Sequence, residues 1–237
     1  MSMYRGYNIE IMTDDDPIDP ILEYDGLGQM ACFHNRYTLG HEHAWDELVD
    51  YCCKHPPFHN IRYSVHDNSW DYMSTGERQS LVNQTAIKLG CEILPLYIYE
   101  HSGITMSTGA FSCAWDSGCV GLIYATPEVM REWYCVKRIT KQTRENARQG
   151  LEYQVEQYDD YLTGNVYGYS VNNGEVGSCY GFSGYDHEKS GLLDHARNDI
   201  DYHIETLRTA KQSKLKSLIR NHVPLSLRGD MLSGVAA

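Results

Sequence analysis

Residues 94–126 read LPLYIYEHSGITMSTGAFSCAWDSGCVGLIYAT, and this stretch decides the fold that we expect for the chain. Two apolar runs, 93–99 and 120–125, are rich in β-branched and aromatic residues and are typical of buried strands. Between them lies a long polar connection, which in a compact domain is usually either functional or disordered. Its aromatic and apolar residues argue against disorder. We therefore look for a candidate site in this interval.

Helix boundaries are marked on both sides of this stretch. Ser74 and Glu77 have the spacing of a capping box, and Gly90 is a suitable left-handed end, so the sequence predicts a helix to about residue 89. Thr126 followed by Pro127 predicts another helix start, because Thr caps a helix and Pro fits its first position. Further predicted helices cover about 46–53, 139–162 and 186 or 190 to 220.

Strands are predicted at both ends of the chain. Residues 7–12 and 27–33 have strand character, and segments 165–171 and 175–182 flank Asn172-Asn173-Gly174, a strong hairpin signal. Hairpin strands with helices between them predict an α+β fold, with one mainly antiparallel sheet, helices packed on one face and a helical C-terminal region. We expect a single domain over 1–222 and a loosely ordered tail over 223–237.

The charge is strongly acidic and unevenly spread. A net charge of −12 argues against binding of duplex nucleic acid, which requires clustered Lys and Arg. Residues 10–25 hold seven acids and no base, whereas 205–237 hold six bases and two acids. This pattern has two possible explanations. Both charged segments are solvent-exposed surfaces, or the basic tail docks on the acidic loop of a second subunit. Together with nineteen Tyr against four Phe, the opposed charges favour a homo-oligomer.

Cysteine usage and the N-terminal sequence indicate the compartment. The eight cysteines stand in a chain of 237 residues whose first residues, MSMYRGYNIEIM, do not resemble a signal peptide. No run approaches the ~20 apolar residues of a membrane span. We expect a cytoplasmic protein without membrane contact, with reduced and mostly buried thiols.

The central interval offers the residue types of two kinds of site. Cys113, His101 and Asp116 are weak catalytic candidates, since a thiolate nucleophile needs a base and the base an orienting acid. The alternative is that the cysteines pack in the core and Asp116 caps a turn. For ligand binding, hydroxyls can hold phosphate or ribose oxygens and an indole can stack on a base. The predicted ligand-binding residues are Arg36, Ser102, Thr105, Ser107, Trp115 and Ser117.

Other polar patterns in the sequence give weaker evidence for a functional site. Arg36 follows a predicted strand and could bind an anion, or could instead form a salt bridge to the acidic region 14–25. His195, Asp199 and His203 share one helix face, but the outer backbones lie ~12 Å apart and cannot serve one metal together. We expect no metal and no cofactor, and no motif of known catalytic mechanism is complete.

Four blocks carry a resemblance to a known family. They are YRGYNIEI, CFHNRYTLGH, the central stretch including YEHSGITMSTGAFSCAWDSGCVGLIY, and VEQYDDYLTGNVYGYSV with SCYGFSG. With them the chain resembles a family of proteins encoded by phages and other mobile elements. The resemblance implies an accessory protein that works in the cytoplasm of an infected bacterium. Many such accessory proteins act against host defences. It implies no catalytic residues.

Three functions remain open from the sequence. The first is a phage-encoded, non-enzymatic protein that counteracts host defence by binding and sequestering a nucleotide-type signal. The second is a hydrolase or transferase that depends on Cys113 and His101. The third is an acidic inhibitor that binds a host defence protein, or a nucleic-acid mimic.

Overall fold

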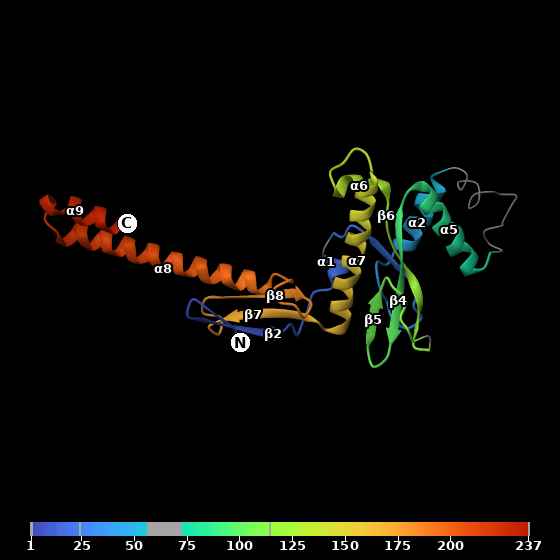
Figure 1. The fold of residues 1–237 in the computed structure, drawn as a ribbon, viewed down its shortest axis with the longest axis horizontal. Helices are drawn as coiled ribbons and strands as arrows, with labels where there is room; N and C mark the ends of the chain where they lie inside the picture. The colour runs from blue at the N-terminus through green and yellow to red at the C-terminus, as the bar shows by residue number, and fades with distance from the viewer. Residues whose placement is uncertain (1, 24, 56–72, 114, 237) are drawn as a thin grey trace. The chain divides into compact units, whose positions relative to one another are not determined.

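The structure is a computed structural model that describes residues 2–23, 25–55, 73–113 and 115–236. The chain divides into two compact units. Unit 1 comprises Met1–Pro17 and Val166–Ala237, and unit 2 comprises Ile18–Asn165. The described residues form one four-stranded antiparallel sheet in each unit (Figure 1).

The sheet of unit 2 is built around the stretch that decided the predicted fold. Its order is β3-β6-β4-β5, with β3 at Gln29–Cys32, β4 at Glu92–Glu100, β5 at Ile104–Ser107 and β6 at Ser117–Ala125. The two predicted strands, β4 and β6, pair directly. The interval between them was not predicted to contain a strand, yet it folds back as β5 and pairs with the end of β4.

Helices cover both faces of this sheet. The helices of unit 2 are α1 (Pro20–Glu23), α2 (Ala44–Cys53), α5 (Thr75–Leu89), α6 (Pro127–Trp133) and α7 (Lys141–Thr163). On one face, Leu94, Leu96 and Ile123 pack with Leu151 and Val155 of α7. On the other face, alternate strand residues such as Leu122 and Tyr124 pack with α2 and α5. The alternation follows from the two-residue repeat of a strand.

The predicted helix boundaries of unit 2 are confirmed. Ser74 and Glu77 form the capping box of α5, and Gly90 ends that helix in the left-handed region at φ 94°. The Thr126 side chain caps α6, and Pro127 is its first residue. The sequence also offers Gly150 as a possible break in the helix predicted over 139–162, but this residue lies inside the continuous helix α7.

Unit 1 has a sheet with α8 on one face. The order is β1-β2-β7-β8, with β1 at Ser2–Tyr4, β2 at Tyr7–Thr13, β7 at Val166–Val171 and β8 at Gly177–Ser183. Helix α8 spans Leu192–His222 and α9 spans Leu225–Ala236. Ile9, Tyr169 and Val171 pack against Leu192, Ala196 and Ile200. On the opposite face, the Tyr180 ring lies over Gly168 and its hydroxyl donates to the Met12 sulfur at 3.3 Å.

The predicted hairpin of unit 1 is present. Asn172 and Asn173 adopt positive φ values of 47° and 56°, which an Asn tolerates better than most residues. Gly174 then donates its N–H to the carbonyl of Val171 at 3.1 Å. Asn172 also joins the hairpin to β2, because its side-chain oxygen accepts the N–H of Asn8 at 2.9 Å.

The α+β class and the helical C-terminal region are confirmed, with two sheets where the sequence indicated one. The single domain over 1–222 stays a prediction. Residues 223–237, expected to be a loosely ordered tail, contain helix α9. The sequence also indicates a loop over residues 55–74, most of which lies outside the described residues. Among those that are described, no helix is both long and apolar enough to cross a membrane.

The thiols are less buried than the sequence indicated. None of the eight cysteines is in a disulfide, and all of them are within the described ranges. Only Cys52 and Cys91 are fully buried. Burial raises the pKa of both thiols to about 12, so they stay protonated at neutral pH.

Candidate functional site

One end of the unit 2 sheet carries an open hollow of about 520 Å³, which we call the Arg36 hollow. It lies where the ends of β4 and β6 meet the loop that follows β3. This volume is in the range of small-molecule sites. The lining residues are His34, Arg36, Ile98, Glu100, Ser102, Trp115, Asp116, Ser117, Gly118 and Val120.

A glycine opposite a strand residue creates the floor of this hollow. Gly118 on β6 is the partner of Ile98 on β4, so the two residues belong to the same face of the sheet. A Cβ at Gly118 would meet no atom within 4 Å. The missing side chain therefore leaves open space above the strands, beside the polar residues at the strand ends.

Glu100 holds the rim together. Its carboxylate forms an ion pair with the Arg36 guanidinium at 3.0 Å and accepts the Tyr37 hydroxyl at 3.4 Å. His34 Nε2 lies 3.8 Å from the same carboxylate. The alternative partner for Arg36, the acidic region 14–25, is thus wrong, because the β3 loop brings Arg36 to the end of β4.

His34 orders the loop that carries Arg36. Its Nδ1 accepts the backbone N–H groups of Arg36 at 3.3 Å and Tyr37 at 3.2 Å. A neutral His34 must then carry its proton on Nε2, the atom that faces Glu100. The Tyr37 ring also stacks on His34 with centroids 5.1 Å apart. Sequence reasoning missed His34 and Glu100, although both adjoin residues that it selected.

Four of the six predicted ligand-binding residues line the Arg36 hollow, namely Arg36, Ser102, Trp115 and Ser117. Trp115 is 96% exposed, so its indole is available for stacking. Ser102 adopts a positive φ of 62°, which places a hydroxyl residue in a strained turn between β4 and β5. The Ser117 hydroxyl donates to the Cys113 carbonyl, and its oxygen can still accept.

Thr105 and Ser107 lie elsewhere. They line a separate open groove of about 490 Å³ between β5 and α7, together with Phe111. Acidic residues dominate its α7 side, where the Asp159 carboxylate accepts the Met106 N–H at 2.6 Å. Burial raises the pKa of Asp159 above its usual value. Thr105 and Ser107 belong to β5, which begins after the turn at 101–103. This turn reverses the chain and carries both hydroxyl residues away from the other four predicted ligand-binding residues.

The three catalytic candidates Cys113, His101 and Asp116 lie close together, but their arrangement does not suit a thiol nucleophile. Asp116 Oδ2 lies 3.6 Å from His101 Nδ1 and 3.9 Å from Cys113 Sγ. A nucleophilic cysteine needs the imidazole next to its sulfur, with the carboxylate behind the imidazole. Here the carboxylate stands between the thiol and the imidazole. Of the three, only Asp116 lines the hollow.

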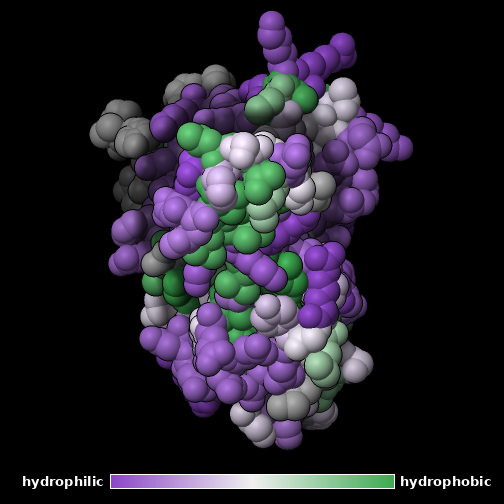
Figure 2. All heavy atoms as spheres, turned by 90° about the vertical axis from the view of Figure 1, so that its left-hand side faces the viewer, coloured by the Kyte–Doolittle hydropathy of each residue, from purple (hydrophilic) through white to green (hydrophobic). Residues whose placement is uncertain are grey.

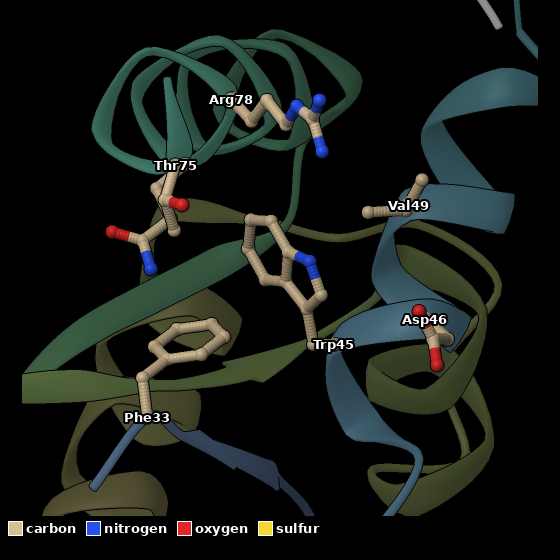
Figure 3. Close-up of a pocket in the computed structure, with 7 residues that line it drawn as sticks. Phe33, Trp45, Asp46, Val49, Thr75 and Arg78 are labelled. Atoms are coloured by element: carbon tan, nitrogen blue, oxygen red, sulfur yellow. The ribbon is translucent and has the colours of Figure 1, made fainter. Parts of the chain in front are cut away.

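A second, smaller pocket of about 190 Å³ lies over the other face of the sheet, between α2 and α5 (Figure 3). Phe33 and Trp45 form its aromatic wall, with ring centroids 5.1 Å apart at 81°. Phe33 donates its N–H to the Val120 carbonyl at 2.6 Å. Consecutive residues Phe33 and His34 thus line two different pockets.

His195 and His203 of α8 pack on the unit 1 sheet. Asp199 accepts the Tyr169 hydroxyl at 2.5 Å, and His195 Nδ1 lies 3.4 Å from the same oxygen. The His203 ring makes an edge contact with Tyr7 at 5.8 Å. Among the described residues, no group of three or more His, Cys, Asp or Glu side chains could hold a metal ion.

The chemistry available in the Arg36 hollow is recognition of a mixed polar ligand. It contains two carboxylates, Glu100 and Asp116, one guanidinium and an exposed indole. Carboxylates accept hydrogen bonds from hydroxyl and amino groups, whereas the guanidinium binds phosphate. Searches against protein-family models, curated proteins and solved structures gave no match to this chain. The function must therefore be inferred from this geometry.

Proposed function

We propose that the chain binds and sequesters a nucleotide-type ligand in the Arg36 hollow without chemical turnover. The observation that supports this most directly is the convergence of Arg36, Trp115 and two serines on one open hollow. Trp115 stacks on the base, the serine oxygens contact ribose, and Arg36 binds phosphate. Following the resemblance to phage-encoded proteins, we propose that this counteracts host defence in the bacterial cytoplasm by removing a signal nucleotide.

The charges of the hollow narrow the ligand class. Arg36 already pairs with Glu100, so a phosphate must compete with a carboxylate for the guanidinium. Asp116 adds a second negative charge nearby. Ligands rich in phosphate are disfavoured, whereas an amino-bearing base and free ribose hydroxyls give both carboxylates a donor. The expected class is a nucleotide with few phosphates, such as a cyclic nucleotide or an ADP-ribose derivative.

Calorimetric titration with a panel of cyclic nucleotides and ADP-ribose derivatives tests the proposal. Stacking on an aromatic side chain contributes about 1–3 kcal/mol per base, so Trp115→Ala is expected to weaken binding at least about fivefold. Trp133→Ala is the matched control, because Trp133 is half-exposed on α6 and does not line the hollow. Absence of binding across the panel, or equal affinity of the Trp115 variant, would overturn the proposal.

Glu100→Gln is expected to strengthen phosphate binding, whereas Trp115→Ala is expected to weaken ligand binding. Removal of this charge releases the Arg36 guanidinium, and the amide still accepts the Tyr37 hydroxyl. Affinity for phosphate-bearing ligands is expected to rise relative to affinity for the parent nucleoside, which loses a charged acceptor at Glu100. Arg36→Ala should lower affinity for the phosphate-bearing ligand alone. A Glu100 variant that binds phosphate more weakly would contradict the assignment of Arg36.

The fate of the ligand distinguishes the proposed binding function from the enzymatic alternative. Chromatography after long incubation should return the nucleotide unchanged, since Asp116 stands between Cys113 and His101. Conversion that disappears in Cys113→Ser, with folding retained, would instead establish the thiol as a nucleophile. The acidic-inhibitor alternative stays a prediction, and charge reversal in region 14–25 tests it through loss of partner binding.

A further inference from the structure

Helix α8 is much longer than the part that packs on the unit 1 sheet. Its first turns contribute Leu192, Ala196 and Ile200 to the core of the unit. Beyond residue 204 the helix continues to His222, and in that part only Ile219 is buried among the described residues. Helix α9 contacts α8 and returns along it (Figure 1). Within the described residues of unit 1, the outer half of α8 therefore has one neighbouring helix and is otherwise largely exposed.

This outer half combines apolar and basic side chains. Leu207, Leu215 and Leu218 are between 44% and 52% exposed. Their spacing places them near one face of the helix, where Lys211 and Lys214 also lie. Figure 2 looks onto the left-hand side of Figure 1, where α8 ends and α9 begins, and shows hydrophobic side chains among hydrophilic ones. We call the exposed surface of residues 205–222 the basic arm.

The opposite end of unit 1 is acidic and aromatic. Asp14 donates its N–H to the Val166 carbonyl at 2.8 Å, which places the acidic stretch where β7 begins. Asp15 and Asp16 are exposed. Nearby, Tyr185 is 70% exposed and lies 5.9 Å from Tyr167, the ladder partner of Thr13. Carboxylates and tyrosine faces both attract Lys and Arg. We call Asp14–Asp16 with Tyr185 the acidic end.

The basic arm leaves the sheet at the end far from these acids. Asp201 of α8 pairs with Arg5 at 3.1 Å and accepts the Tyr4 hydroxyl at 3.3 Å, so α8 passes the β1–β2 turn there. Strand β2 then runs about 20 Å from this turn to Thr13. The arm extends in the other direction by about 25 Å. Within unit 1, the basic arm cannot reach the acidic end of its own copy.

We propose that the basic arm of one copy docks on the acidic end of a second copy. When two copies of unit 1 lie side by side in opposite directions, each arm meets the other copy's acidic end. Both contacts form around one two-fold axis, and the assembly closes as a dimer. Opposite charges select the antiparallel arrangement, while the exposed leucines and Tyr185 supply apolar area.

Direct pairing of two basic arms is disfavoured by their charge. Residues 205–237 hold six bases against two acids, so two arms side by side repel each other. The acidic end supplies the charges that relieve this repulsion. The occupant of the basic arm is thus a second copy of the chain, held through its acidic end.

Reciprocal charge reversal tests this pairing in the full chain. Sedimentation velocity should give twice the chain mass of 27.1 kDa for the unaltered protein. The arm variant Lys211→Glu/Lys214→Glu and the end variant Asp15→Lys/Asp16→Lys should each raise the dimer dissociation constant at least about tenfold. An equimolar mixture of the two variants should dimerise again, because every contact between unlike variants pairs opposite charges. Circular dichroism checks that these exposed substitutions leave the fold intact.

The control is Lys88→Glu/Lys141→Glu, which makes the same change of charge on exposed positions of α5 and α7. It should leave the dimer unaffected. A monomeric unaltered protein at its highest soluble concentration would overturn the proposal, as would a mixture that stays monomeric. A tighter dimer in the arm variant would instead establish arm-to-arm packing. A monomer whose arm binds anionic phospholipid vesicles would assign the arm to a lipid surface and equally contradict the proposal.

Discussion

The sheets of the two units differ in what covers them. In unit 2, α7 packs on one face and α2 with α5 on the other, so strand residues pointing either way are buried. In unit 1, α8 packs on one face, and tyrosines provide much of the apolar surface. A sheet buried on both faces depends on close packing at every position. A sheet with one packed face depends more on polar contacts of its large aromatic residues.

The two cores should respond differently to loss of the same side chain. Leu151 on α7 and Leu192 on α8 are both 0% exposed. Leu151→Ala should lower the free energy of unfolding by about 3–5 kcal/mol, because its neighbours cannot collapse into the cavity. Leu192→Ala should cost about 2–3 kcal/mol, since it lies in the first turn of α8, which can relax. Urea denaturation measures both, and a larger loss in the Leu192 variant would reverse the comparison.

The same two variants test the predicted single domain. All four tryptophans lie between residues 45 and 133, so their emission follows unit 2, whereas circular dichroism follows the helices of both units. A single domain requires coincident transitions by the two probes in each variant. Separate midpoints would show that the units unfold independently.

The next largest difference in stability between the two units is expected at glycines that lie close to a neighbouring strand or side chain. A Cβ at Gly121 would collide with the Ala31 carbonyl of the neighbouring strand β3. Gly121→Ala should therefore cost about 2–3 kcal/mol, because a strand packed on both faces cannot shift. A Cβ at Gly177 in unit 1 would lie 2.6 Å from the Asp199 carboxylate, a movable side chain.

Gly177→Ala is thus the matched substitution, with an expected loss of about 1–2 kcal/mol, because Asp199 must move and loosen its hydrogen bond to Tyr169. Thermal unfolding of both variants makes the comparison. Equal losses would show that the unit 1 sheet is as tightly constrained as the sheet of unit 2.

The polar contacts of unit 1 can be removed at one oxygen. Tyr169→Phe deletes the hydroxyl that donates to Asp199 and leaves the buried ring in place. The expected loss is about 1–2 kcal/mol, because a hydrogen bond to a charged group contributes more than a neutral one. Tyr124→Phe in unit 2 is the control, since its hydroxyl donates to the Ala44 carbonyl, a neutral acceptor. A smaller loss for Tyr169 than for Tyr124 would contradict this ranking.

The smallest effect is a dependence of stability on pH in unit 2. His41 Nδ1 accepts the Met30 N–H at 3.0 Å, and burial lowers the pKa of His41 below its usual value of 6.5. Between these two pKa values the unfolded chain binds more protons, so stability should fall as the pH drops below 6.5. The slope is at most about 1.4 kcal/mol per pH unit.

His41→Asn keeps an acceptor near the Met30 N–H but does not titrate. The variant should therefore lose this part of the pH dependence in urea denaturation at a series of pH values. An unchanged slope would assign the dependence to another group.

Local features of the fold were readable from the sequence, and the site only in part. The caps at Ser74 and Thr126 and the Asn172 hairpin were predicted because they depend on neighbours within a few residues. Arg36, Trp115 and Ser117 were selected for their chemistry, and the fold brings them together. Their grouping depends on the register of β4 with β6 and on the β3 loop. The unpredicted strand β5 moved Thr105 and Ser107 to another groove.

By itself, the sequence determined the longer strands, the helix caps, the Asn172 hairpin and the uneven charge of this protein, because propensity and capping act over short distances. Only the tertiary structure decided which carboxylate meets Arg36, the order of Cys113, Asp116 and His101, and the division into two sheets. Those relations join residues far apart in the chain or on opposite sides of a turn. They depend on strand register and on the direction of α8 across its sheet, which short-range patterns do not encode.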